Sequence, residues 1–118
     1  MDAKSMFWAG LAALCLLGPA SAQPWPAGQP VKVIVPFPPG GAADTTMRLL
    51  GPKLTEALGQ PVVVENKPGA NGIIGAEAVA KAEADGHTLL FAPREVFGVN
   101  PTLHKSLPYD PVNGLAPV

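Results

Sequence analysis

The sequence predicts an α/β fold, a βαβαβ unit whose strands form a parallel sheet covered by helices on both faces. Strand-length runs of nearly continuous apolar residues alternate with stretches of helical spacing, a pattern typical of strands buried on both sides. A glycine-rich loop follows each of the first two expected strands. Because parallel strands joined by helices end at one edge of the sheet, we expect both loops to face a common crevice there.

The first strand is expected at residues 31–35 (VKVIV), after a proline-rich lead-in. A helix should follow, from Ala43 or Asp44 to Leu58, with the next glycine as its stop. Its apolar residues recur near one face: Met47, Leu50, Leu54 and Leu58. Pro52 interrupts this pattern, so either the helix kinks there or a second short helix begins at that residue.

The second half of the unit repeats this order. A strand at residues 62–65 is followed by a glycine loop at 67–72 (KPGANG) and by a helix at 73–82. Within that helix Glu77 and Lys81 stand four residues apart, a spacing that favours an ion pair.

An Asp-Gly turn then leads to the third expected strand, at residues 88–92. Beyond Ala92 the sequence is rich in proline, glycine and asparagine and shows no clear period, so no further element is assigned. The last residues, 115–118 (LAPV), look like the start of an apolar strand. We therefore expect the chain to be truncated.

Residues 1–22 have the pattern of a secretory signal peptide. An apolar run follows Lys4, and an Ala-Ser-Ala sequence precedes the expected cleavage point. The run is shorter than the roughly 20 apolar residues that a membrane span requires. We therefore expect cleavage after Ala22, removal of Cys15 with the signal, and a mature chain of residues 23–118 that is not inserted into the membrane.

Charge and cysteine content argue against several classes of function. The chain has 8 basic and 9 acidic residues and a net charge of −1, so it lacks a basic footprint for nucleic acid. Its single cysteine, Cys15, lies in the expected signal. His87 and His104 stand far apart without ligand spacing, so we expect no metal site. No nucleophile, base and orienting acid can be assembled, so we expect no catalytic residue and no cofactor.

The stretch at residues 31–44 (VKVIVPFPPGGAAD) joins a strand, a double-glycine loop and the start of a helix. Glycines let the backbone approach a ligand closely, and the first amides of a helix have no intrahelical partner. The sequence therefore predicts an anion-binding site here, suited to a carboxylate or a phosphate.

Three segments resemble the extracytoplasmic solute receptors of tripartite tricarboxylate transporters, the Bug-type family. They are PFPPGGAAD at 36–44, LGQPVVVENKPGANGIIGAEAVAKAEADGHTLLF at 58–91 and NPTLHKSLPYDPVNGLAPV at 100–118. The resemblance implies a type II periplasmic binding protein fold, in which two α/β lobes close on a small carboxylate and present it to a membrane permease. It further implies a periplasmic location, and that residues 23–118 form the N-terminal part of the first lobe, with the second lobe absent.

The family's first ligand loop falls on six residues of this chain: Phe37, Pro38, Pro39, Gly40, Gly41 and Ala42. The prolines carry no amide hydrogen and stiffen the loop, so the resemblance implies that Gly40, Gly41 and Ala42 donate to the ligand. A second contact region is implied after the second strand: Pro68, Gly69, Ala70, Asn71 and Gly72. Its amides either serve the same ligand or merely turn the chain.

Two charged residues near these loops have open roles. We expect Asp44 to act as the N-cap of the first helix, accepting a bond from the amide of Thr46 or Met47. The alternative is contact with a ligand amine, which would imply an amino-acid ligand. Arg94 stands where the family usually has small and hydroxyl residues. It either forms a bidentate pair with a ligand carboxylate or a solvated surface pair with Glu95.

These observations favour a binding receptor for a small carboxylate over an enzyme. One alternative is a truncated fragment without independent activity. Another is an enzyme domain that binds a phosphate or nucleotide at Gly40 and Gly41, although the loop matches neither GxGxxG nor the lysine-containing phosphate loop.

Overall fold

The computed structural model describes residues 24–26 and 28–118. Its elements in chain order are β1 (Val31–Val35), α2 (Ala42–Leu58), β2 (Val62–Asn66), the 3-10 turn η1 (Ala70–Gly72), α3 (Ile73–Ala80), β3 (Thr88–Leu90), α4 (Glu95–Gly98) and α5 (Asn100–Leu103). The expected signal peptide, with Cys15, lies outside the described residues. Among the helices of the described residues, none combines the length and the apolar composition needed to cross a bilayer.

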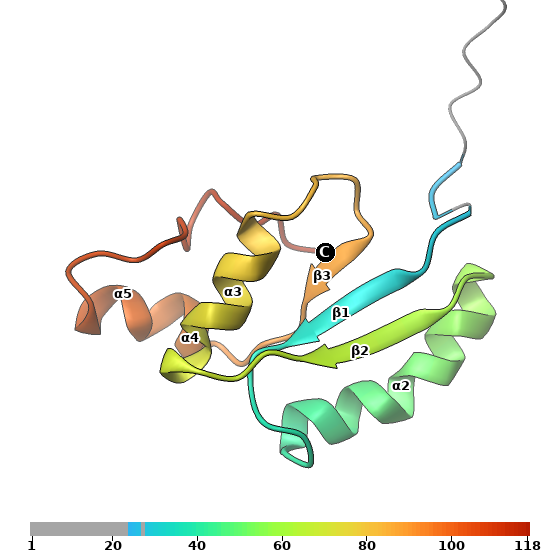
Figure 1. The fold of residues 1–118 in the computed structure, drawn as a ribbon, viewed down its shortest axis with the longest axis horizontal. Helices are drawn as coiled ribbons and strands as arrows, with labels where there is room; N and C mark the ends of the chain where they lie inside the picture. Colours follow the sequence, from blue (N-terminus) through green and yellow to red (C-terminus); the bar gives the residue numbers. More distant parts are fainter. Residues whose placement is uncertain (1–23, 27) are drawn as a thin grey trace, which may run out of the picture.

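The three strands form one parallel sheet in the order β2-β1-β3. The central strand places Val33 opposite Val64 on one side and opposite Leu89 on the other. Since α2 connects β1 to β2 and α3 connects β2 to β3, the predicted βαβαβ arrangement is confirmed. The three strands therefore point toward one edge of the sheet, as Figure 1 shows.

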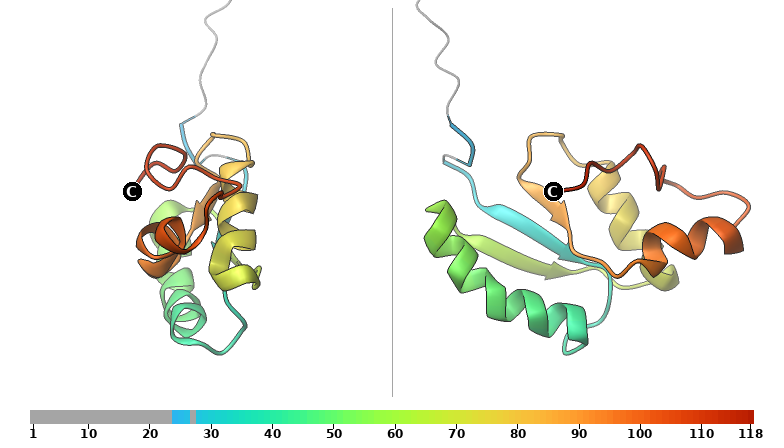
Figure 2. Two further views of the ribbon diagram at one scale, coloured as in Figure 1. Left: turned by 90° about the vertical axis from the view of Figure 1, so that its left-hand side faces the viewer. Right: turned by 180° about the vertical axis from the view of Figure 1, so that it is seen from behind.

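Helices α2 and α3 cover opposite faces of the sheet (Figure 2). Each face carries its own hydrophobic cluster. Val33 and Val35 of β1 pack against Met47 of α2 on one face. On the other face, Leu90 of β3 packs in the cluster of Ala76 from α3. Alternation along the strands accounts for this division, because neighbouring residues of a strand point to opposite faces. Burial on both faces explains why the strands read as continuous apolar runs.

Helix α2 is continuous through Pro52, so of the two alternatives for this residue, the one in which a second helix begins there is wrong. Gly51 precedes the proline and is buried. A residue before proline normally avoids helical conformation because its Cβ meets the proline ring, and glycine has no Cβ. The helix stops where predicted, at Gly59, which has a φ of 67° and donates its N–H to the Thr55 carbonyl.

The expected apolar face of α2 is partly wrong. Met47 is buried, but Leu50 and Leu54 are 42% and 37% exposed. The buried residues of the helix are instead Asp44, Met47 and Gly51, which recur at helical spacing along a neighbouring stripe. A polar residue and a glycine on the inner face conceal that face from a pattern based on apolar residues alone.

The remaining boundaries differ from the predictions by one or two residues. Strand β2 includes Asn66, while β3 ends at Leu90, although the Phe91 amide continues the ladder by donating to the Ile34 carbonyl. Helix α3 ends at Ala80, and Glu77 forms the predicted ion pair with the lysine four residues later. Helices α4 and α5 lie where no element was assigned, because four residues are too few to display a 3.6-residue period.

Helix α3 approaches the end of β1 closely at Gly75. A Cβ at this position would lie 2.5 Å from the Pro36 Cβ and 2.9 Å from the Pro36 Cα. Because Pro36 belongs to the backbone that leaves the sheet, it cannot move aside as a flexible side chain would. The contact fixes the distance between α3 and the first loop.

We predict that Gly75→Ala lowers the free energy of unfolding by about 2 kcal/mol, the usual cost of overpacking a close contact. Urea denaturation followed by circular dichroism measures the change. The matched control is Gly98→Ala, because a Cβ at Gly98 would have no atom within 4 Å. Equal unfolding midpoints for the two variants would contradict the assigned contact.

Candidate functional site

The two glycine loops leave β1 and β2 at the same edge of the sheet and are held together there. The amide of Lys67 donates to the carbonyl of Val35 over 2.9 Å, and the Asn66 side chain donates to the carbonyl of Phe37 over 3.1 Å. A Cβ on Gly72 would lie 3.5 Å from the ring of Phe37. The predicted placement of both loops at the carboxyl edge is confirmed. The expected common crevice is not, because the cavity at this edge is lined by the first loop and not by the second.

A cavity of about 460 Å³ lies between the first loop and the start of α2. Its lining consists of Phe37, Pro38, Pro39, Gly41, Ala42, Ala43, Asp44 and Pro93. The structure thus brings most of the predicted first loop to one cavity, together with a residue that follows β3. Neither Arg94 nor the second loop contributes to the lining.

Three residues at the start of α2 that line this cavity have backbone amides without a hydrogen-bond acceptor in the described part of the chain. Gly41 is the N-cap residue, and the first amide to bond back to it is that of Thr45, over 2.9 Å. Among the described residues, the amides of Gly41, Ala42 and Ala43 have no hydrogen-bond acceptor. Unpaired amides and the positive end of the helix dipole favour an anion at this position.

Gly40 differs from its predicted role as a ligand donor. Its amide donates to Asp44 Oδ2 over 2.8 Å and is therefore already occupied. Gly40 has a φ of 88°, a left-handed conformation that turns the loop back over the first turn of α2. This turn brings the Gly40 amide to the Asp44 carboxylate. The donors that remain for a ligand are the amides of Gly41, Ala42 and Ala43.

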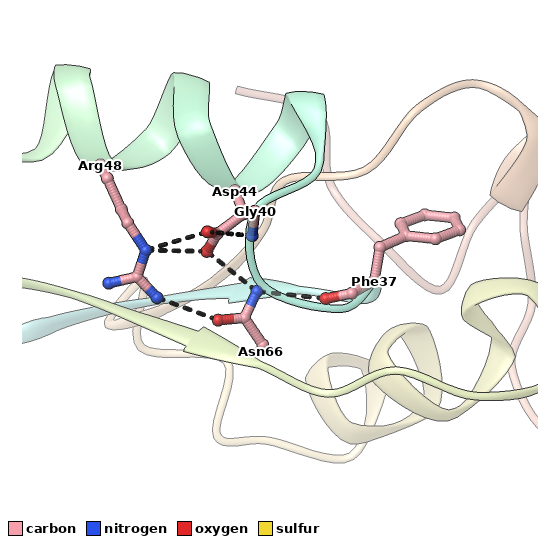
Figure 3. A network of polar contacts seen from close by, with 5 residues as sticks. All are labelled: Phe37, Gly40, Asp44, Arg48 and Asn66. Carbon is pink, nitrogen blue, oxygen red and sulfur yellow. Dashed lines mark hydrogen bonds and ion pairs between the residues drawn. The ribbon is translucent and has the colours of Figure 1, made fainter.

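Asp44 is not the N-cap, and the prediction that it caps α2 is wrong. It is the third residue of the helix, about one turn after the N-cap position, which is occupied by Gly41. No side-chain hydrogen bond caps this end of α2. Its carboxylate accepts from the Gly40 amide and, at 3.0 Å each, from Arg48 Nε and Asn66 Nδ2 (Figure 3).

The hydrogen bonds to Asp44 stabilise its charged form. The residue is only 3% exposed. The bond from Arg48, then that from the Gly40 amide, then that from Asn66 lower the pKa of Asp44 to about 2, against the opposing effect of burial. The carboxylate therefore stays ionised beside the cavity, with its charge compensated by Arg48.

Two members of this network, Asn66 and Arg48, were not expected at the site from the sequence. Asn66 Nδ2 bridges the Asp44 carboxylate and the Phe37 carbonyl, while its Oδ1 accepts from Arg48 Nη2 over 3.1 Å. The contact of Arg48 could have been predicted, because an aspartate and an arginine four residues apart in a helix favour an ion pair. Asn66 gives only a weak signal, a carboxamide at the point where an apolar strand enters a glycine loop.

The second loop has a left-handed backbone and lies beside the first loop. Four consecutive residues have positive φ, from Gly69 through Gly72. The amide of Gly72 donates to the Gly69 carbonyl over 3.0 Å, and the Asn71 side chain is bonded to Asn100. Gly72 is buried, whereas Ala70 and Asn71 are exposed.

Arg94 lies immediately before α4 and is exposed. No ion pair joins it to Glu95 within the described part of the chain, so the alternative of a surface pair with Glu95 is not borne out. The two residues are consecutive at the start of a helical turn, where neighbouring side chains diverge. No group of three potential metal ligands occurs among residues 24–26 and 28–118.

Comparison with known proteins places this geometry in context. Residues 46–118 match the family described as "Tripartite tricarboxylate transporter family receptor". BugT of Bordetella pertussis is 47% identical over 111 residues, which make up 93% of this chain and 32% of BugT. The chain therefore spans about a third of the length of this curated relative.

Two solved structures are similar in both sequence and fold. The periplasmic binding protein BugD is 39% identical with a TM-score of 0.64, over 72% of this chain and 28% of BugD. MatC of Rhodopseudomonas palustris, solved with bound malate, is 40% identical with a TM-score of 0.68. The match covers 72% of this chain and 29% of MatC.

We predict that Asp44 makes the stability of the protein depend on pH in the acid range. Its folded pKa of about 2 lies below the ordinary aspartate value, so the stabilisation is complete above about pH 4 and is lost as the pH falls toward about 2. In Asp44→Asn this contribution is absent. The difference in unfolding free energy between wild type and variant should therefore shrink over that range.

Urea unfolding of both proteins at a series of pH values measures this difference. Other acidic groups with lowered pKa values, such as Glu65 and Asp110, are common to both proteins and cancel in the comparison. A difference that stays constant down to about pH 2 would show that Asp44 titrates normally.

Proposed function

The chain belongs to the tripartite tricarboxylate transporter receptor family, a family of receptors and not of enzymes, and we propose that it binds a small carboxylate for uptake. In this proposal residues 23–118 form the N-terminal part of the first lobe of a periplasmic receptor, exported by the signal peptide at residues 1–22. A membrane permease receives the ligand. The observation that carries the proposal is the set of amides without a hydrogen-bond acceptor at the start of α2, which belong to residues that line a cavity.

The carboxylate of the ligand accepts hydrogen bonds from the amides of Gly41, Ala42 and Ala43. These amides have no acceptor among the described residues. Bonds to a charged group contribute about 1.5–3 kcal/mol each, and the helix dipole adds to them. Asp44 does not repel the ligand strongly, because its charge is compensated by Arg48 and by two further donors. The anion and the buried carboxylate therefore coexist at one helix end.

The carboxylate class is supported by the relatives. The structure of MatC holds malate, and the name of the family refers to tricarboxylates. For a ligand with a second carboxylate, we assign the further contacts to the second loop, Gly69 to Gly72, and to Arg94. Arg94 is exposed and lies one residue after Pro93, which lines the cavity. A guanidinium there suits bidentate pairing with a carboxylate.

Transport requires that the ligand favour one conformation of the receptor. A ligand shifts an equilibrium only by its difference in affinity between the two states. The described cavity contacts the ligand carboxylate from one side only. Contacts from an opposing lobe therefore provide the difference in affinity between the open and the closed receptor. The permease then recognises the closed form.

We predict that Ala42→Pro weakens carboxylate binding by about tenfold or more, because it removes one amide donor to a charged group. Proline is well accepted at the first position of a helix, and Gly41 before it is already extended, with φ −74° and ψ 172°. The measurement is a titration of the chain with malate and with citrate, followed through the amide resonances of Gly41 and Ala43.

The matched control is Ala42→Ser, which changes the side chain and retains the amide. It should bind within about twofold of the wild type, since a serine side chain at this position alters no backbone donor. ATP is titrated in parallel to test the enzyme alternative. Saturable shifts with ATP but with neither carboxylate, or equal affinities for the proline and serine variants, would contradict the proposed site.

A further inference from the structure

The second glycine loop has a backbone that its own sequence does not favour. Gly69 and Gly72 have φ values of 134° and 85°, which glycine adopts freely. Between them, Ala70 and Asn71 have φ values of 49° and 52°. Left-handed conformation is unfavourable for alanine and only tolerated by asparagine, so such residues persist where the surrounding structure holds them.

Asn100 of α5 provides a two-point clamp on Asn71. Its Nδ2 donates to the Asn71 carbonyl over 3.0 Å, and its Oδ1 accepts from Asn71 Nδ2 over 2.8 Å. Asn100 is 0% exposed. A buried carboxamide is unfavourable without hydrogen bonds, and both of its groups are bonded to the same residue. The clamp therefore fixes the backbone and the side chain of Asn71 at once.

A second contact joins the same two parts of the chain. Gly72 packs against Val96 of α4, and a Cβ on Gly72 would lie 2.7 Å from Val96 Cγ2. Val96 is fully buried, and its carbonyl accepts a 2.6 Å bond from the Tyr109 hydroxyl. The beginning of α3 and helix α4 indeed lie side by side in Figures 1 and 2. The α4–α5 segment thus packs against the second loop and supports it.

We propose that Asn100 is a positioning residue of the ligand site, which sets the direction of the amides of the second loop. The amides of Ala70 and Asn71 have no acceptor among the described residues, and both residues are exposed at the edge of the sheet. Because α4 and α5 follow the loop after β3, the clamp also fixes the second loop relative to Arg94. The role in binding rests on the proposed function; the role in loop conformation does not.

The experiment compares Asn100→Leu with the wild-type chain by two readouts. Leucine has the same branching and the same number of side-chain heavy atoms but is larger, and it removes both bonds to Asn71, whose exposed groups can then bond to water. We expect the amide resonances of Gly69 to Gly72 to shift and broaden. We expect the dissociation constants for malate and citrate to rise roughly fivefold, the ratio that corresponds to a lost hydrogen bond.

The matched control is Thr55→Val at the opposite edge of the sheet. Thr55 Oγ1 accepts from the Val62 amide over 3.0 Å, so the variant also loses a side-chain hydrogen bond, but away from both loops. It should leave the loop resonances and both dissociation constants unchanged. Should Asn100→Leu fail to fold, Asn71→Gly decides, because glycine accepts the left-handed conformation while removing one arm of the clamp.

Unchanged loop resonances in the clamp variants would overturn the proposal. A loop that moves without any change in affinity would overturn the positioning role in binding. A wild-type chain that binds neither acid would instead overturn the proposed function, and the loop resonances would still show whether Asn100 sets the loop.

Discussion

The buried carboxylate of Asp44 is the interaction on which the ligand edge of the sheet depends. A charge that is 3% exposed requires donors around it, and here they come from the first loop, from α2 and from the end of β2. Satisfying this one group joins three elements that the sheet alone would leave independent. The amide of Gly40 is committed to Asp44, whereas the amides of Ala42 and Ala43, in the first turn of α2, have no internal partner among the described residues. The candidate anion site therefore lies directly beside a carboxylate whose own charge is already compensated.

Both loops at this edge are held by asparagine side chains. Backbone that leaves a parallel sheet loses its neighbouring strand as a hydrogen-bond partner, and a carboxamide can replace it because it both donates and accepts. Asn66 does so for the first loop, through the Phe37 carbonyl, and Asn100 for the second, through Asn71. The two loops thus present their amides from a rigid framework, which lowers the entropic cost of ordering them around a ligand.

The sheet and its loops could be predicted from the sequence because their determinants are local. Apolar runs of strand length and the glycines after them are visible within a few residues. The role of Asp44 could not be predicted, because it depends on where α2 begins. A shift of three residues in the start of the helix decides whether Asp44 is the N-cap or the third helical residue. The contacts of Asn66 and Asn100 connect residues 29 apart in the chain, and no local pattern reports such a pairing. The family resemblance was correct, because it rests on long segments and not on a single motif.

The polar network around Asp44 also bears on the order in which the protein folds. Its longest connection joins Phe37 to Asn66, and all of its members lie between these two residues. Closing a loop of this length has a modest entropic cost, so the network can form once the first two strands have paired. We therefore expect the first loop and the start of α2 to form early in folding, before β3 docks. The second loop reaches its final conformation only after α5 has formed, because Asn100 of α5 holds it.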